Sequence, residues 1–269
     1  MALPQVPRYS TRTRHASERH TMPSYHARAL VLRKTKLGET DSILNLLAED
    51  GRQIRAVAKG VRKPGSRFGG RLEPHSVVDL LLHTGRNLDV ITEADTVVTH
   101  SAVREDFDRA SAAAVVADVL DKMSLEGQAE DRLFGLGDAT LAALEVADVS
   151  RLPQIVSAFL VKAMAMHGYR PQLESCAACA ASAEGGSGFS LAAGGIVCPD
   201  CGSGEAVVRF SEDGRSQLER MLSSTMAEVA SAHEDSETVR QTLDLLRGFV
   251  AYHVPAKMKA LDMYAMRAG

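Results

Sequence analysis

Short apolar runs separated by turn residues fill the first hundred residues of the chain. Their length and their content of Val, Leu and Ile predict strands at residues 27–33, 42–48, 53–59, 76–83 and 87–92. Tight turns link the second strand to the third and the fourth to the fifth, whereas a long basic segment, 60–74, links the third to the fourth. The pattern predicts a small Greek-key barrel over residues 25–100. The OB-fold is the commonest nucleic-acid-binding barrel of this kind, and an SH3-like barrel would give nearly the same pattern.

From about residue 101 the spacing of apolar residues becomes helical. We predict that one helix buries a face formed by Val103, Phe107, Ala110, Ala114 and Ala117, which recur at spacings of four and three. Further helices are expected at residues 130–147, 151–168, 213–224 and 237–253. The sequence therefore predicts an α+β multidomain protein, with a helical domain in two parts, 101–172 and 205–269, and an inserted module at 173–204.

The inserted module contains all four cysteines of the chain, Cys176, Cys179, Cys198 and Cys201. Two C-x-x-C pairs at this separation can supply four thiolates to one tetrahedral Zn²⁺, and a site with four protein ligands is structural. Disulfides or redox dithiols are the alternative, but nothing marks the chain as secreted and no other thiol is present for exchange. Ala180 stands where a glycine often follows such a turn. A short hairpin is expected at residues 189–197.

The net charge of −3 hides a strong asymmetry between the two ends of the chain. Residues 1–75 carry a charge of +9 and residues 76–269 a charge of −12. A basic end suggests a polyanion site, although a solvated basic face without a partner is the alternative. Residues 1–24 are predicted to be a disordered basic leader, either an upstream-start extension or a nucleic-acid arm. The chain has no secretory signal pattern and no run of about 18 apolar residues, so we expect a cytoplasmic protein without a membrane partner.

Ten cations of the predicted barrel are candidate DNA ligands, placed before the first turn, on the third strand and in the long segment. They are Arg33, Lys34, Lys36, Arg52, Arg55, Lys59, Arg62, Lys63, Arg67 and Arg71. OB-folds follow a phosphate backbone with such a basic face, and a flexible glycine-rich loop would let its arginines approach phosphates closely. Aromatic residues are scarce in this region and the chain has no Trp. Binding should therefore be electrostatic, tolerant of sequence and steeply dependent on salt.

Enzyme signatures are missing from the sequence. Gly60 and Gly65 have the spacing of a P-loop, but Ser66 and Arg67 stand where Lys and Ser/Thr are required. No H-E-x-x-H motif, nucleophile elbow or two-metal carboxylate cluster is present. His167 and His253 lie near helix ends, where a capping or packing role is expected. The chain is therefore predicted not to be an enzyme.

Several segments together resemble the RecO family of recombination mediators. They are residues 37–44 (LGETDSIL), 56–74 (AVAKGVRKPGSRFGGRLEP), 168–171 (GYRP), 189–198 (FSLAAGGIVC) and 246–253 (LRGFVAYH). The resemblance implies an N-terminal OB-fold, a helical domain and a zinc module that some members lack. It covers nearly the whole chain. The leader, Ala180 and Ala260 depart from the family pattern.

The resemblance also implies a function in DNA repair and recombination. A RecO-like protein would bind ssDNA and dsDNA, anneal complementary strands, and with RecR help to load RecA onto strands coated by the single-stranded-DNA-binding protein (SSB), in association with the nucleoid. The acidic SSB tail would bind an apolar pocket with a basic rim on the helical domain, and Arg109, Lys122 and Arg132 are the nearest basic candidates. A zinc-ribbon transcription regulator, a metal-assisted nuclease and a protein-binding scaffold are the alternatives.

Overall fold

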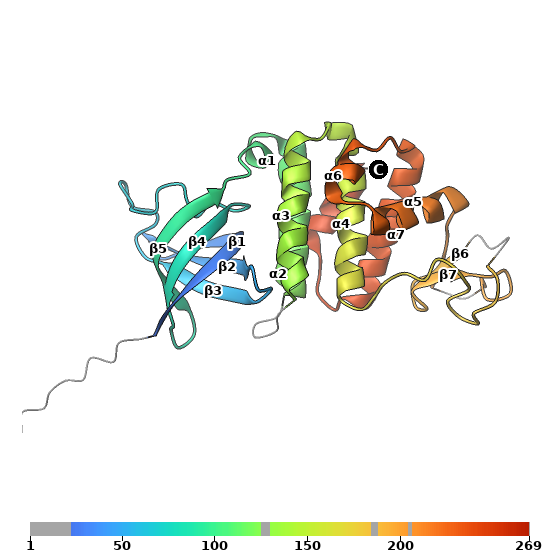
Figure 1. Cartoon of the computed structure of the whole chain (residues 1–269), viewed down its shortest axis with the longest axis horizontal. Coiled ribbons are helices and arrows are strands. Elements are labelled where there is room, and N and C mark those ends of the chain that lie inside the picture. Colours follow the sequence, from blue (N-terminus) through green and yellow to red (C-terminus); the bar gives the residue numbers. More distant parts are fainter. Residues whose placement is uncertain (1–22, 125–129, 184–187, 204–205, 269) are drawn as a thin grey trace, which may run out of the picture.

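The structure, a computed structural model, describes residues 23–124, 130–183, 188–203 and 206–268. It places a β-barrel on one side of a bundle of helices and a small three-stranded sheet on the other side (Figure 1). The leader predicted for residues 1–24 lies outside the described residues except for Pro23 and Ser24, and Ser24 already belongs to the first strand.

Five strands build the barrel: β1 (Ser24–Leu37), β2 (Asp41–Ala48), β3 (Gln53–Ala58), β4 (Val77–His83) and β5 (Asp89–Val98). They close in the order β1-β2-β3-β5-β4, with β1 antiparallel to both β2 and β4 and a short parallel contact between β3 and β5. This is the strand order of an OB-fold. The predicted small barrel is therefore confirmed, and it is an OB-fold rather than an SH3-like barrel. Alternate side chains such as Leu44, Leu46 and Ile91 fill the interior.

β1 and β5 are longer than predicted because both continue past their apolar runs. The first half of β1 pairs with β4 and its second half with β2, and the register shifts between Val31 and Arg33 where the strand bends from one partner to the other. β5 pairs with β4 as far as Val98, although its last four side chains are exposed. The ends of β1 and β5 are set by backbone pairing with neighbouring strands, which cannot be predicted from the hydropathy of the sequence.

The helical part consists of eight α-helices in the described residues. They are α1 (Ala102–Glu105), α2 (Phe107–Met123), α3 (Asp131–Val146), α4 (Leu152–Met166), α5 (Glu212–Ser223), α6 (Met226–Ser231), α7 (Ser236–His253) and α8 (Lys259–Ala268). α4 is central and packs against α2, α3, α5, α6 and α7. Among the described residues one stretch, Val149–Met166, has the length and mean hydropathy (1.2) of a membrane span. It is 61% buried inside the fold, as expected of a core helix.

The buried face predicted for this helix is wrong in part. Val103, which lies in the separate helix α1, and Ala117 are buried as predicted, but the positions between them do not form the buried face. Phe107 is 69% exposed and Ala114 is exposed, whereas the side of the helix that carries Val116, Val119 and Leu120 faces the core. Alanine and valine occupy most positions from 111 to 119, so their spacing fits more than one face. Packing against α3, α4 and α8 decides between the faces. The later helices predicted from apolar spacing do bury apolar residues, among them Phe159 and Ala163 of α4 and Leu243 of α7.

The inserted module carries three short strands, β6 (Gly188–Ser190), β7 (Gly195–Val197) and β8 (Val207–Arg209). β6 pairs antiparallel with β7, which confirms the predicted hairpin, and β8 adds to the other edge of β6. β8, α6 and α8 were not predicted. Each is short or weakly patterned, and tertiary packing rather than local sequence stabilises such elements.

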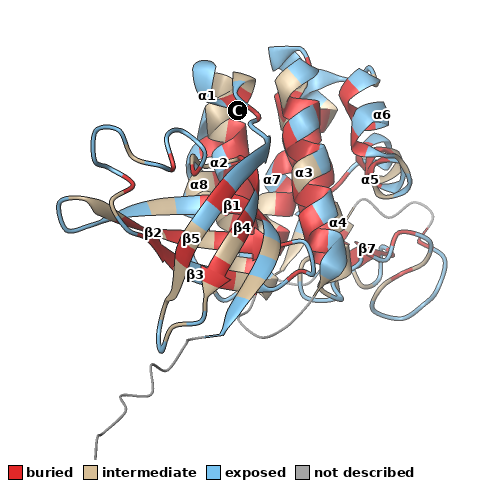
Figure 2. Ribbon diagram, turned by 60° about the vertical axis from the view of Figure 1, so that its left-hand side comes forward, coloured by how far each residue is buried: buried red, intermediate tan, exposed pale blue. Residues whose placement is uncertain are grey.

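The barrel and the helices share a hydrophobic core rather than touching at a small contact. Leu30, Leu47 and Val77 of the barrel are buried in the same cluster as the inner faces of α2, α3 and α4. Figure 2 shows buried residues along the sides of α3 and α4 that face the interior. Gly51, in the β2–β3 turn with φ of 83°, lies so close to Glu130 that an added Cβ would meet its backbone at 2.2 Å. A side chain at this position would push the two parts of the molecule apart.

Candidate nucleic-acid interface and metal centre

The β1–β2 turn and the long basic loop form a single structural unit. Asp41 Oδ1 accepts hydrogen bonds from the Gly60 amide and from the Thr40 hydroxyl, each at 2.8 Å. The Gly60 amide first, and then the Thr40 hydroxyl, hold the pKa of Asp41 below its usual value. The Arg62 amide donates to the Thr40 carbonyl at 2.9 Å, and the Arg62 guanidinium donates to the Gly38 carbonyl at 3.1 Å. Asp41 therefore fastens the loop to the turn.

The long loop, expected to be flexible, is instead an ordered cover on the barrel. Val61, Phe68 and Leu72 are buried in the barrel core. Between them the backbone makes consecutive turns, in which the amides of residues 63, 66, 69 and 71 each donate to the carbonyl three residues earlier. Gly60, Gly65 and Gly69 adopt positive φ (67°, 71° and 49°), which these turns require. The glycines therefore shape the loop, and its apolar residues fix it.

The four cations of the loop point to solvent. Arg62, Lys63, Arg67 and Arg71 are exposed, and none has an ion pair among the described residues. The Arg67 guanidinium lies 4.9 Å from the centre of the Phe68 ring, and the Arg71 guanidinium donates to the Arg67 carbonyl at 2.8 Å. These contacts orient the two arginines without neutralising them.

Strands β1 and β3 bring further cations to the same end of the barrel. Lys36 pairs in register with Ser42, which pairs with Ala58, so Lys36 and Lys59 lie at neighbouring strand ends. Lys59 follows β3 and is exposed, as is Arg55 farther along that strand. Within the described chain none of the three has an ion pair. Seven of the ten predicted DNA ligands are therefore exposed and have no ion pair in the described residues. We name them the basic face: Lys36, Arg55, Lys59, Arg62, Lys63, Arg67 and Arg71.

The other three predicted DNA ligands are held in ion pairs. Lys34 pairs with Glu73 at 2.7 Å and Arg52 with Asp50 at 2.8 Å. Arg33 turns toward the helices and pairs with two carboxylates of α2, Asp118 at 3.3 Å and Asp121 at 3.2 Å. The structure therefore gives Arg33 a role between the two parts of the molecule, which the charge pattern alone did not reveal.

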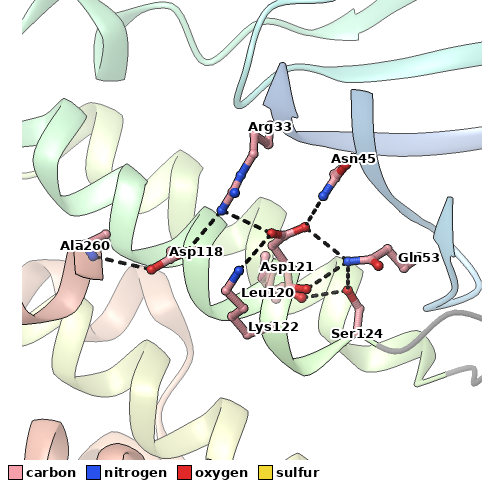
Figure 3. A network of polar contacts seen from close by, with 9 residues as sticks. All are labelled: Arg33, Asn45, Gln53, Asp118, Leu120, Asp121, Lys122, Ser124 and Ala260. Carbon is pink, nitrogen blue, oxygen red and sulfur yellow. Dashed lines mark hydrogen bonds and ion pairs between the residues drawn. The ribbon is translucent and has the colours of Figure 1, made fainter. Parts of the chain in front are cut away.

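Asp121 is the centre of this contact between barrel and helices (Figure 3). Its side chain is only 6% exposed and accepts hydrogen bonds from Asn45 at 2.7 Å and Gln53 at 3.1 Å, besides the ion pair with Arg33. A buried carboxylate that is fully paired in this way is costly to disrupt. The sequence signal was an Asp at positions 118 and 121, within the apolar stretch of residues 112–120 and directly after it. No residue near them in α2 indicated their partners.

His100 makes a second polar contact, at the junction between β5 and α1. It is buried, with Nδ1 2.9 Å from Glu145 and Nε2 3.0 Å from Asp138, both on α3. Burial disfavours the charged imidazolium, but the hydrogen bonds and charges of the two carboxylates outweigh it and raise the pKa of His100 above its usual value. With a carboxylate at each ring nitrogen, the charged form donates from both.

The four cysteines converge as their spacing predicted. Their Sγ atoms all lie within 4.8 Å of one another, and the Sγ atoms of Cys179 and Cys198 are 3.8 Å apart. A regular tetrahedron with Zn–S bonds of about 2.3 Å has edges of about 3.8 Å. This separation is too long for a disulfide, in which the S–S distance is about 2.05 Å. The site therefore has the size that a tetrahedral metal ion requires.

Backbone groups support the cysteine site. Amide hydrogen bonds, above all from Cys198, lower the pKa of the Cys176 thiol to about 6, which favours the thiolate that metals bind. Ala180, at the glycine position of the first turn, adopts φ of 61°, and its amide donates to the Cys176 carbonyl at 2.8 Å. A left-handed conformation costs an alanine about 1–2 kcal/mol, and the turn imposes it here.

An apolar groove of about 600 Å³ lies between α3 and α6. Ala139, Ala143, Met226 and Ala230 line it, and Arg151 lies at its edge and donates to the Ala230 carbonyl at 3.0 Å. Of the basic candidates expected near such a pocket, Arg109 donates to the Leu144 carbonyl at the adjacent end of α3. Lys122 pairs with its neighbour Asp121 on α2. Arg132 pairs with Glu130 at the start of α3, the end opposite to the groove. Arg151 was missed because its segment is mostly apolar.

Comparison with known proteins bears on both parts of the chain. Residues 22–100 match the family model described as recombination protein O N terminal, and residues 104–262 match recombination protein O C terminal. The DNA repair protein RecO of Rubrobacter xylanophilus is 37% identical over 237 residues, covering 87% of this chain and 94% of that protein. RecO of Frankia casuarinae is 44% identical over 190 residues, covering 67% of this chain and 74% of that protein. An OB-fold barrel, a helical part with a four-cysteine cluster, and these matches together show that the chain belongs to the RecO family of DNA repair proteins.

Proposed function

We propose that this protein is a recombination mediator that binds ssDNA and dsDNA without strong sequence preference and anneals complementary strands. The observation that carries the proposal is the basic face, which presents seven cations without carboxylate partners on strand ends and on a loop rooted in the barrel core. Cations held in place in this way lose little conformational freedom when they bind phosphates. The contacts recognise charge, which every DNA strand offers.

The chemistry of annealing suits this surface. Two DNA strands repel each other through their phosphates, and a basic surface that neutralises both removes that barrier. The one aromatic residue in the loop, Phe68, is 1% exposed and so cannot stack on a base. The bases of a bound strand therefore stay free to pair. No step of this activity requires bond making or breaking by the protein.

The groove between α3 and α6 is our candidate for the acidic tail of SSB. Its apolar lining would take up an apolar side chain of the tail, and Arg151 and Arg109 would face its carboxylates. Asp148 also lines the groove, so the rim is of mixed charge. We further propose that RecR binds this protein and that the two together help RecA to replace SSB on the strand, in the cytoplasm at the nucleoid.

The four cysteines would hold one Zn²⁺. All four ligands come from the protein, so the metal would supply structure and no reactive position. Leu191 and Phe189 of the same module pack against α7, so an intact module supports the end of the helical part. The division of the chain into a barrel at 25–100, helical parts at 101–172 and 205–269, and a module at 173–204 is our proposal for its domains.

The experiment that tests the mediator proposal is annealing of complementary strands that are coated with SSB, in the absence of ATP. We expect rapid annealing with intact SSB and slow annealing with SSB that lacks its acidic tail. Arg151→Glu should reduce the rate only on strands coated by intact SSB, and Arg215→Glu, on α5 away from the groove, is the control. If the protein binds DNA but does not anneal strands, a sequence-reading regulator with a zinc ribbon becomes the better account.

A further inference from the structure

A cluster of aromatic rings lies where α4 and α7 end. The rings of Tyr169 and His253 are 4.5 Å apart and inclined by 32°, so that the two lie roughly face to face. The ring of Tyr252 meets the same imidazole edge-on at 5.1 Å. Tyr169 follows α4 and Tyr252 is the penultimate residue of α7, so the two helix ends bring the rings together.

His253 connects the cluster to buried residues of the helical part and to the inserted module. His253 Nε2 is 2.8 Å from the Leu191 carbonyl of the inserted module, and the imidazole packs edge-on against Phe249, which is 1% exposed. Gly168, with φ of 86°, turns the chain after α4, and the Tyr169 amide donates to the Met164 carbonyl at 2.9 Å. Both the backbone of Tyr169 and the imidazole behind its ring are therefore fixed.

The two tyrosines are nevertheless open to solvent. Tyr169 is 39% exposed and Tyr252 is 54% exposed, although the chain has only twelve Phe and Tyr residues and no Trp. One face of the Tyr169 ring is covered by His253, so its exposed surface lies on the other side. Packing alone explains buried rings such as Phe189, but it does not require rings that remain this exposed.

An exposed cation follows each of the two tyrosines along the chain. Arg170, next to Tyr169, is exposed and close enough to Lys162 for its charge to add to burial in lowering the pKa of that lysine. Lys257 is exposed in the segment between α7 and α8. Two carboxylates, Glu174 and Glu219, line the groove on the other side of Arg170. Exposed aromatic faces with cations next to them are the combination that binds the bases and phosphates of single-stranded nucleic acid.

We propose that Tyr169 and Tyr252 form a base-stacking site for single-stranded DNA, separate from the basic face of the barrel. Unpaired bases stack on the two tyrosine rings, and Arg170 and Lys257 neutralise the adjoining phosphates. A base within a duplex has both faces covered by its neighbours, so this site selects unpaired strands. The inference rests on the proposed DNA-binding function. It adds a second DNA site, which prefers unpaired strands, whereas the basic face binds any DNA strand.

The test compares three DNA probes of equal length by fluorescence anisotropy: oligo(dT), an abasic strand with the same number of phosphates, and a duplex. In the variant with Tyr169→Leu and Tyr252→Leu we expect the Kd for oligo(dT) to rise by at least about 5-fold, the lower end of one lost base stack. The Kd values for the abasic strand and the duplex should not change. Tyr169→Phe with Tyr252→Phe keeps both rings and should retain tight binding of oligo(dT), and Phe107→Leu is the control for an exposed ring elsewhere.

Two outcomes would overturn the base-stacking site. One is an unchanged Kd for oligo(dT) in the leucine variant with metal content and melting temperature preserved, and the other is an equal loss of affinity for all three probes. If the unaltered protein binds the abasic strand tightly, the proposal that the basic face binds phosphates is retained after either outcome. Failure of the unaltered protein to bind any probe at low salt would instead overturn the proposed DNA-binding function and this site with it.

Discussion

The barrel and the helical part use their arginines and lysines in different ways. On the barrel, the basic face holds seven cations that have no carboxylate partner in the described chain. On the helical part six of the eleven arginines pair with nearby carboxylates, namely Arg132–Glu130, Arg215–Glu219, Arg220–Glu234, Arg240–Glu237, Arg247–Asp262 and Arg267–Asp108. The difference shows that the capacity of a region to bind a polyanion depends less on its number of cations than on whether the fold has already paired them with carboxylates.

The same contrast separates the ten predicted DNA ligands. Arg33, Lys34 and Arg52 were grouped with the others on charge, but the fold pairs each of them with Asp or Glu. A cation that already has a partner must lose it before it can bind a phosphate, and an exposed pair of this kind is worth about 0–1 kcal/mol, so we expect it to contribute somewhat less to binding than an unpaired cation. We therefore propose that DNA affinity comes chiefly from the basic face and that Arg33 orients the barrel against the helices.

The largest expected effect comes from the cysteine site, at the opposite end of the molecule from the basic face. Cys198→Ser should abolish metal binding and lower the melting temperature by more than about 10 °C, because structural zinc contributes about 10–16 kcal/mol of binding free energy. Metal analysis and thermal unfolding measure both effects. Asp200→Asn, in the same turn, is the control and should behave as the unaltered protein. Retained metal and stability in Cys198→Ser would rule out ligation by four cysteines.

The next effect concerns the contact that joins the two regions. Asp121→Ala removes the carboxylate that Arg33, Asn45 and Gln53 share, and we expect the free energy of unfolding to fall by about 1–3 kcal/mol in urea. Asp95→Ala is the control, since Asp95 is exposed on β5 and has no ion pair in the described chain. Asp121→Ala leaves Arg33 with Asp118 as its one remaining carboxylate partner in the described chain, so duplex affinity should not decrease. A loss of duplex affinity would mean that Arg33 binds DNA only when Asp121 orients it.

A smaller effect on stability should come from His100, whose charge depends on pH. The pKa of His100 is raised in the folded protein, so its stabilising contribution is complete below the ordinary histidine pKa of about 6.5 and is lost as pH rises through the folded value. The difference in melting temperature between the unaltered protein and His100→Gln should therefore shrink as pH rises above about 6.5. His26→Gln, at an exposed position of β1, is the control. A difference that stays constant with pH would show that folding does not change the pKa of His100, and one that grows with pH would show that the fold keeps His100 neutral.

Much of this architecture could be predicted from local patterns. Short runs rich in Val, Leu and Ile predicted the strands. Two C-x-x-C pairs predicted the cysteine cluster, because metal ligation depends on a spacing that can be read directly from the sequence. The face of α2 could not be predicted, since alanines fit several faces and Phe107 lies outside the core. The long loop was misjudged because its glycines suggested flexibility, whereas Val61, Phe68 and Leu72 anchor it.

Features that depend on two distant segments were the ones missed. Asp121 meets Arg33 across 88 positions of the chain, and His100 meets Glu145 across 45. No local pattern reports such pairs. The rings of Tyr169 and Tyr252 likewise become neighbours only through the packing of α4 on α7.

The measurement that tests the account most directly is the salt dependence of duplex binding. Replacing Arg55, Lys59, Arg62 and Lys63 together by Gln should flatten the slope of log K against log[salt] by about 3.6, because each cation that neutralises a phosphate contributes about 0.9. Replacing the paired cations Arg28 and Arg52 by Gln should leave the slope nearly unchanged. An unchanged slope in the first variant, or equal losses in both, would contradict the assignment of DNA binding to the unpaired cations of the barrel.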